Sequence, residues 1–210
     1  VEVDESAEHN CDTPYHTRAL QPALLLWHLM GDTLEVSPLT DWLINWIEAS
    51  AREESGKPAG LPPAAISYPT GLVRSTGGKW WDPGCHSTFT TYRWPRGLSL
   101  LSQALVLGYV QTGDTTYLAP IRAMAGLRDE GDASADEGSL AWAAATLGNK
   151  AVDAMAKYRL ATGNAQFDNV LRSAGDPYVR AQLTNQVQPL EEGLRSLVNA
   201  LRFDRAAHTS

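Results

Sequence analysis

The chain has 210 residues, of which 43% are hydrophobic and 20% charged, as expected for one substantial globular domain. Its formal net charge of −7 argues against a nucleic acid partner, because nucleic acids select large basic surfaces. No apolar run approaches the roughly 20 residues of a membrane span, so we expect no membrane partner.

The N-terminal segment begins VEVDESAEHN, without an initiator methionine or a signal pattern. We expect residues 1–210 to form a single helical domain that is part of a longer natural chain. The two cysteines, Cys11 and Cys85, suit either a disulfide or free thiols. A zinc site is the less favoured alternative, because the spacing of the candidate ligands matches no standard zinc pattern; these are His9, Cys11, His16, Cys85 and His86.

The first clear helix signal follows Ser37–Pro38, where a good N-cap precedes a proline at the first helical position. Apolar residues then recur at the spacing of a helix with one buried face. They are Leu39, Trp42, Leu43, Trp46 and Ile47.

Residues 52–97 are predicted to be a long inserted loop, because proline and glycine punctuate them throughout. Within it, residues 57–96 hold five cationic side chains and one anionic one, Asp82, and they are rich in aromatic residues. Long loops in compact domains are usually functional or disordered, and disordered segments are poor in aromatics. The composition therefore indicates an ordered surface for an anionic ligand with flat apolar faces.

Further helices are expected after this loop. Asp176–Pro177 repeats the cap-and-proline start, and Pro189 begins a helix with apolar residues along one side (Leu190, Leu194, Leu197, Val198 and Leu201). The remaining candidates are 98–110, 117–127 and 140–160, the last weakened by Gly148, since glycine costs about 1 kcal/mol in a helix interior.

A weak internal repeat joins these helices. The segments LLLWHLMGD, ALVLGYVQTGD and AMAKYRLATGN each end an apolar helix on glycine (Gly31, Gly113 and Gly163), followed by Asp or Asn. Glycine can end a helix in the left-handed conformation, and the Asp or Asn can cap the next helix. We therefore predict an all-α fold of repeated antiparallel helical hairpins, an α/α toroid or partial toroid, with the loop inserted between copies.

The TGD-x-x-Tyr-Leu junction and the GGKWWDP loop resemble the (α/α)-toroid domains of carbohydrate-active enzymes, which include polysaccharide lyases and some glycoside hydrolases. The resemblance implies a secreted or periplasmic enzyme that binds a long sugar chain in a cleft. It carries over no functional residue, so the site is assigned from the residues themselves.

Tryptophan packs flat against the apolar faces of sugar rings, which makes Trp80, Trp81 and Trp94 candidate platforms, with anchoring of the loop as the alternative. β-Elimination of a uronate needs a group that neutralises the carboxylate, a base and an acid. We assign His86 as the base, Tyr92 as acid or base, and Arg93 and Arg96 as the carboxylate clamp. Lys79, Tyr15, His16 and Arg18 complete the predicted substrate-binding set.

The predicted activity is therefore β-elimination of an acidic polysaccharide. Hydrolysis is a second possibility, although it needs two carboxylates and the loop holds Asp82 alone. A noncatalytic module that binds glycan or protein is a third. No cofactor is predicted, since nucleotide-binding motifs are absent. Structural calcium or zinc is not favoured, and the acidic segment 129–137 suits a solvated linker better than a calcium loop.

Overall fold

The computed structural model describes residues 10–31, 36–84 and 92–208, with side chains up to residue 200. The chain is mostly helical, with 62% of it in helix, as predicted. The helices are α1 (Gln21–Met30), α2 (Ser37–Ala51), α3 (Leu98–Thr112), α4 (Ala119–Gly126), α5 (Leu140–Leu147), α6 (Asn149–Thr162), α7 (Asp168–Ala174), α8 (Pro177–Thr184) and α9 (Gln188–His208). Short 3-10 turns cover Pro14–Arg18, Thr115–Leu118 and Ala165–Phe167, and two short strands, β1 (Cys11–Asp12) and β2 (Ile66–Ser67), pair antiparallel.

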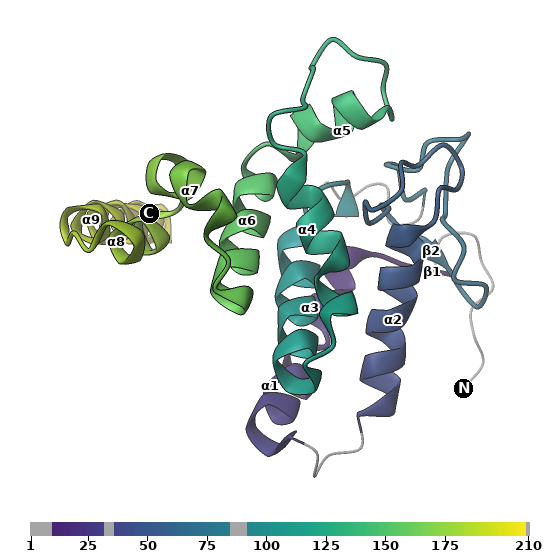
Figure 1. The fold of residues 1–210 in the computed structure, drawn as a ribbon, viewed down its shortest axis with the longest axis horizontal. Coiled ribbons are helices and arrows are strands. Elements are labelled where there is room, and N and C mark those ends of the chain that lie inside the picture. Colours follow the sequence, from purple (N-terminus) through teal and green to yellow (C-terminus); the bar gives the residue numbers. More distant parts are fainter. Residues whose placement is uncertain (1–9, 32–35, 85–91, 209–210) are drawn as a thin grey trace.

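Most of the helices from α2 onward follow one another in a row across the molecule, while α1 packs against α3 and α5 against α6. Helix α2 packs against α3 and α4, these two pack against α6, and the chain then passes through α7 and α8 to α9. Figure 1 shows α2 at one side of the row and α8 with α9 at the opposite end, while β1, β2 and the long loop lie beside the end of α2. No described helix has both the length and the apolar composition to cross a membrane.

The stripe predicted for α2 is confirmed, because Leu39, Leu43 and Trp46 are buried in the core. The predicted N-cap is wrong by one residue. Ser37 lies inside the helix, and the carbonyl of Val36 accepts the N–H groups of Leu39 and Thr40. A short turn at Val36 therefore starts the helix in place of a side-chain cap.

The two matching junctions have the same local structure. Gly113 and Gly163 end α3 and α6 with φ of 71° and 73°, in the left-handed region. The side chains of Asp114 and Asn164 then accept the N–H group two residues further on, each at 2.9 Å. Gly31 adopts another conformation, and Asp32 lies outside the described residues.

Gly148 divides the long helix expected over 140–160. It has φ of 48°, and α5 ends before it while α6 begins after it. Asp176 caps α8 as predicted, by accepting the N–H groups of Tyr178 and Val179.

The described part of the loop between α2 and α3 packs against the helices. Leu61 and Ala65 are fully buried, and Trp80 joins the main core. The loop also covers the end of α2, where the buried ammonium of Lys57 donates to the carbonyls of Ser50 and Pro58, both at 2.9 Å.

Cys11, on β1, is disulfide-bonded. This excludes a free thiol and a metal ligand at that position. The predicted partner, Cys85, lies outside the described residues, although it is the only other cysteine in the sequence.

The apolar side predicted for the last helix is present but not buried. Leu194, Leu197 and Val198 are 54%, 57% and 46% exposed. Helix α9 instead meets α8 through Gly193, where an added Cβ would lie 2.6 Å from the ring of Pro177. The close contact at this glycine joins the two helices, while these three apolar side chains stay exposed.

Candidate functional site

A pocket of about 340 Å³ opens where the long loop meets the start of α5. We call it the tryptophan pocket. Its lining residues are Lys79, Trp81, Asp82, Arg93, Trp94, Glu137 and Trp142. Four of them, Lys79, Trp81, Arg93 and Trp94, belong to the set predicted from the sequence.

Aromatic packing builds the apolar part of this pocket. The rings of Trp94 and Trp142 stack with centroids 5.8 Å apart and an interplanar angle of 23°. The ring of Trp81 lies 5.2 Å from that of Trp142. Trp81 and Trp142 are half-buried, so each combines support from the core with an exposed ring surface.

Trp80 lies behind these rings and supports them. Its side chain has no exposed surface, its ring centroid is 5.0 Å from that of Trp94, and its indole N–H donates to the carbonyl of Gly138 at 2.9 Å. A fully buried ring cannot stack on a ligand, so the predicted substrate contact of Trp80 is wrong. The alternative reading, in which it anchors the loop, is the one that the structure shows.

Gly138 fits the pocket only because it has no side chain. Its φ is +86°, and an added Cβ would lie 1.9 Å from the ring of Trp81. The segment before α5 can therefore lie directly against the indole and bring Glu137 to the pocket edge.

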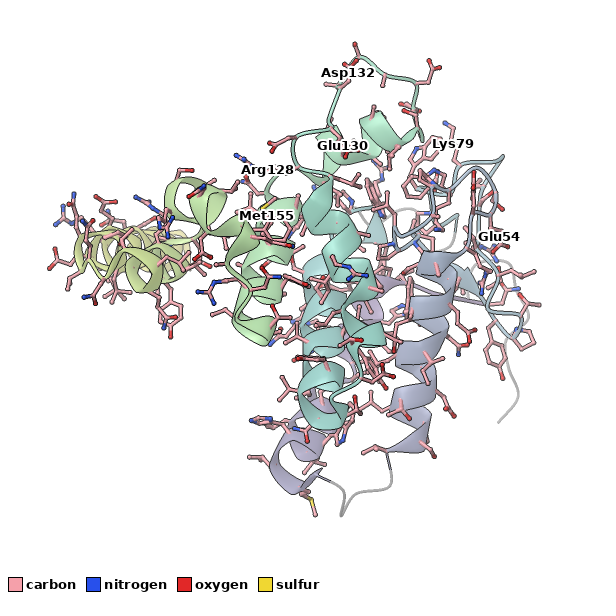
Figure 2. The ribbon with its side chains drawn as sticks, in the orientation of Figure 1. Glu54, Lys79, Arg128, Glu130, Asp132 and Met155 are labelled. Carbon is pink, nitrogen blue, oxygen red and sulfur yellow. The ribbon has the colours of Figure 1, made fainter. Side chains whose placement is uncertain are left out.

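The polar lining is balanced in charge. Lys79 and Arg93 are exposed cations, Asp82 is half-buried, and Glu137 is an exposed anion. One oxygen of Asp82 accepts the backbone N–H of Gly84 at 3.0 Å, which fixes the orientation of that carboxylate. Figure 2 shows Lys79 on the long loop, beside the segment that leads into α5.

A second cluster of polar and aromatic side chains forms where the N-terminal segment meets the end of the loop. We call it the Asp12–His16 cluster; it contains Asp12, Tyr15, His16, Arg18 and Tyr92. The ring of Tyr92 lies 5.4 Å from that of Tyr15 and 5.7 Å from that of His16. Arg18 donates to the phenol oxygen of Tyr15 at 2.9 Å.

The predicted site residues therefore divide between two places. Tyr15, His16 and Arg18 come together with Tyr92, although 74 residues of sequence separate Arg18 and Tyr92. Arg96 is exposed and does not line the tryptophan pocket. His86, the predicted base, lies outside the described residues.

Four residues of these sites were not assigned from the sequence. Asp82 was named only as the single carboxylate of the loop. Trp142 looks like one more apolar residue of a helix, and Glu137 belongs to a segment interpreted as a solvated linker. Asp12 could have been found, because it lies near His16 in the sequence and carboxylates often orient an imidazole through Nδ1.

Within the described residues, no three His, Cys, Asp or Glu side chains gather in a way that could hold a metal ion. Comparison of the chain with protein-family models, curated proteins and solved structures finds no match.

Proposed function

We propose that the protein binds an acidic polysaccharide at the tryptophan pocket and cleaves it by β-elimination. One observation carries the proposal: three indole rings and two cations, Lys79 and Arg93, line the same pocket. Uronate sugars present apolar ring faces to the indoles and a carboxylate to the cations. A secreted or periplasmic location belongs to the proposal, and the disulfide at Cys11 supports it, because disulfides persist in oxidising compartments.

The proposed architecture is a partial α/α toroid. The equivalent junctions at Gly113 and Gly163 support it, as does the succession of α3 and α4, then α6 and α7, along the row. In this architecture the loops at one end of the row build the substrate cleft, and the long loop supplies its main wall.

The chemistry assigns different tasks to the two cations and to Tyr92. Arg93 and Lys79 stabilise the negative charge that develops on the uronate carboxylate when the adjacent C–H bond breaks. Tyr92, next to Arg93 in the chain, protonates the leaving glycosidic oxygen. No metal or cofactor enters these steps.

The direct test is incubation with a panel of polyuronates, followed by the ultraviolet absorbance of the unsaturated product. We expect Arg93→Ala to lower kcat/KM by about 10²–10³-fold, the usual effect of removing a group that stabilises transition-state charge. Arg195→Ala, at an exposed position on α9, is the matched control and should retain wild-type turnover. Equal activity of both variants would exclude Arg93 as the group that binds the uronate carboxylate.

A binding measurement distinguishes the contribution of the aromatic surface from that of the cations. Trp142→Ala should weaken equilibrium binding of a uronate oligosaccharide about tenfold, which corresponds to 1.4 kcal/mol of lost contact. Trp142→Phe, which keeps a flat ring, should recover part of the affinity. Unchanged affinity in Trp142→Ala would exclude the pocket as the sugar site.

Hydrolysis is the second candidate, and one observation favours it. Asp82 and Glu137 line the same pocket, so the site holds the two carboxylates that the loop sequence by itself did not offer. New reducing ends without the unsaturated product, lost in Asp82→Asn and Glu137→Gln, would establish hydrolysis. Binding without any product would indicate a noncatalytic glycan-binding module.

A further inference from the structure

The carboxylate of Asp12 is held from three sides. Its Oδ2 accepts the indole N–H groups of Trp42 and Trp46, at 2.5 and 2.9 Å. These two tryptophans are four residues apart and lie on one side of α2. The other oxygen, Oδ1, lies 2.7 Å from Nδ1 of His16. The side chain of Asp12 is 23% exposed, so a largely buried carboxylate with two fixed donors faces the imidazole.

This contact determines which imidazole nitrogen carries the proton. A carboxylate only accepts hydrogen bonds, so a 2.7 Å contact places the hydrogen on Nδ1 of His16. The backbone N–H of Thr13 also approaches Nδ1, at 3.3 Å, and would need the opposite tautomer, with Nδ1 as acceptor. The contact with Asp12 is shorter and charge-assisted, and therefore it prevails.

With Nδ1 bound to Asp12, the second nitrogen, Nε2, is the basic one in the neutral ring. His16 is 34% exposed, so the ring reaches solvent while its orientation is fixed from inside. The ring of Tyr92 packs edge-on against both the imidazole and the ring of Tyr15, and Arg18 donates to the oxygen of Tyr15. A base, a proton donor and a cation are thus assembled within one small region.

We infer that His16 is the base of the elimination reaction and that Asp12 is its positioning residue, through the hydrogen bond between Oδ1 and Nδ1. This inference depends on the proposed β-elimination and deepens it by naming the base. It moves that task from His86 to a residue that lies beside Tyr92, the proposed acid.

The proton transfers balance in this arrangement. Nε2 of His16 takes the proton from the carbon next to the uronate carboxylate. The electron pair of that C–H bond forms a carbon–carbon double bond, and the adjacent C–O bond breaks. The leaving oxygen takes the phenol proton of Tyr92. His16 then loses its proton to water, and Tyr92 regains one from water.

The cluster also lies next to the proposed sugar site. The ring of Tyr92 packs against the ring of His16, and Arg93, the next residue, lines the tryptophan pocket. Consecutive Cα atoms are about 3.8 Å apart, so the two sites are adjacent. One polysaccharide chain can therefore contact the indoles and the Asp12–His16 cluster together.

The first experiment compares His16→Gln with a histidine that has no role in the site. His28→Gln is the matched control, because His28 is exposed on α1 and pairs only loosely with Gln111, at 3.4 Å. We expect His16→Gln to lower kcat by about 10²–10⁴-fold while oligosaccharide binding is retained, and His28→Gln to resemble the wild type. Wild-type kcat in His16→Gln would overturn the inference.

The second experiment tests Asp12 without depending on turnover. Nitrogen-15 NMR of the neutral imidazole should show that the single ring proton of His16 is on Nδ1. In Asp12→Asn the introduced amide can still accept from the indoles, but its NH₂ donates to Nδ1 and forces the proton to Nε2. The NMR signature should therefore reverse, and kcat should fall about 10⁴-fold with KM little changed. A wild-type His16 protonated on Nε2 would mean that it merely caps the turn at Thr13, which overturns the inference.

Failure of the proposed function gives a different pattern. If the wild type forms no unsaturated product from any polyuronate, elimination itself is excluded, and the assignment of a base fails with it whatever the tautomer. If the wild type is active and His16→Gln is equally active, only the assignment of His16 is wrong. Thermal unfolding of each variant distinguishes a loss of activity from a loss of folding.

Discussion

The burial of Lys57 against the end of α2 determines its pKa. Lys57 lies in the long loop and reads as one of five cations on a basic surface, yet its side chain is fully buried against the end of α2. Burial, with a smaller contribution from the charge of Arg52, lowers the pKa of Lys57 to about 8 from its ordinary 10.5. The ammonium therefore belongs to the packing of the loop and not to ligand binding.

The stability of the protein should rise with pH because of Lys57. Its pKa is lower in the folded chain, so between about pH 8 and 10.5 the unfolded chain binds more protons, and the free energy of unfolding increases with pH. We expect a gain of about 1.5 kcal/mol from pH 8 to 9.5. Urea unfolding at successive pH values measures it.

The controls for this prediction are two methionine variants. Lys57→Met should lose the dependence on pH, whatever its absolute stability, since its carbonyl partners at Ser50 and Pro58 remain. Lys79→Met, at an exposed lysine of the same loop, should keep it. Parallel pH profiles for the wild type and Lys57→Met would contradict the assignment.

In the tryptophan pocket, as at Lys57, the residue type does not determine whether a side chain is buried. Loop composition proposed Lys79, Trp81, Arg93 and Trp94 as site residues, and in the structure these four line one pocket. It could not distinguish Trp81 from Trp80, because adjacent residues of identical type differ only in which one faces the core. It also could not find Trp142, which reaches the pocket from another element.

At the scale of elements, the segment before α5 acts as one edge of the tryptophan pocket. Gly138→Ala should destabilise the protein and displace Trp81, because its Cβ would meet the indole ring at 1.9 Å. Gly113→Ala is the matched control: it has φ of +71° with nothing within 4 Å, so it should cost only the roughly 1–2 kcal/mol of left-handed strain.

Urea unfolding and tryptophan fluorescence measure the difference between these variants. We expect a clearly larger loss of stability and an altered emission spectrum in Gly138→Ala alone. Equal stability losses with unchanged fluorescence would show that Trp81 gives way without consequence, and would weaken the case for a built pocket.

The junction between α6 and α7 depends on Asn164. Its side chain accepts the N–H group of Gln166 at 2.9 Å, as Asp114 does for Thr116 at the equivalent position. Asn164→Ala should lower the free energy of unfolding by about 1 kcal/mol, the usual value for a lost cap. Asn164→Asp should lower it by only a few tenths of a kcal/mol, because aspartate caps about as well. Thermal unfolding of the two variants provides the measurement, and an alanine variant as stable as the wild type would contradict it.

Helix positions were largely predictable, because periodicity and end signals are local. The stripe of α2, the cap at Asp176 and the glycines ending α3 and α6 appear where the sequence indicated. The exposure of the apolar side of α9 was not predictable. A leucine stripe shows where that side lies but not whether another element covers it.

Across the whole molecule, packing is uneven. Helices α3, α4 and α6 each place several residues in the core, whereas in the described part of α9 only Pro189 is buried. We expect amide hydrogen exchange to be slowest in α3, α4 and α6 and fastest in α9, because local opening is easiest where little apolar surface is buried. Exchange in α9 as slow as in α3 would contradict this order.

The sequence by itself determined the helical class, the place of the long loop between two helices, and the residue types gathered there. These properties follow from local periodicity, turn chemistry and composition, which need no knowledge of distant neighbours. Only the tertiary structure decided which tryptophans face a pocket, that Lys57 is buried, and that Asp12 orients His16 beside Tyr92. Such contacts join segments that are far apart in the chain, and packing selects among them by shape and by hydrogen-bond geometry, which one-dimensional patterns do not contain.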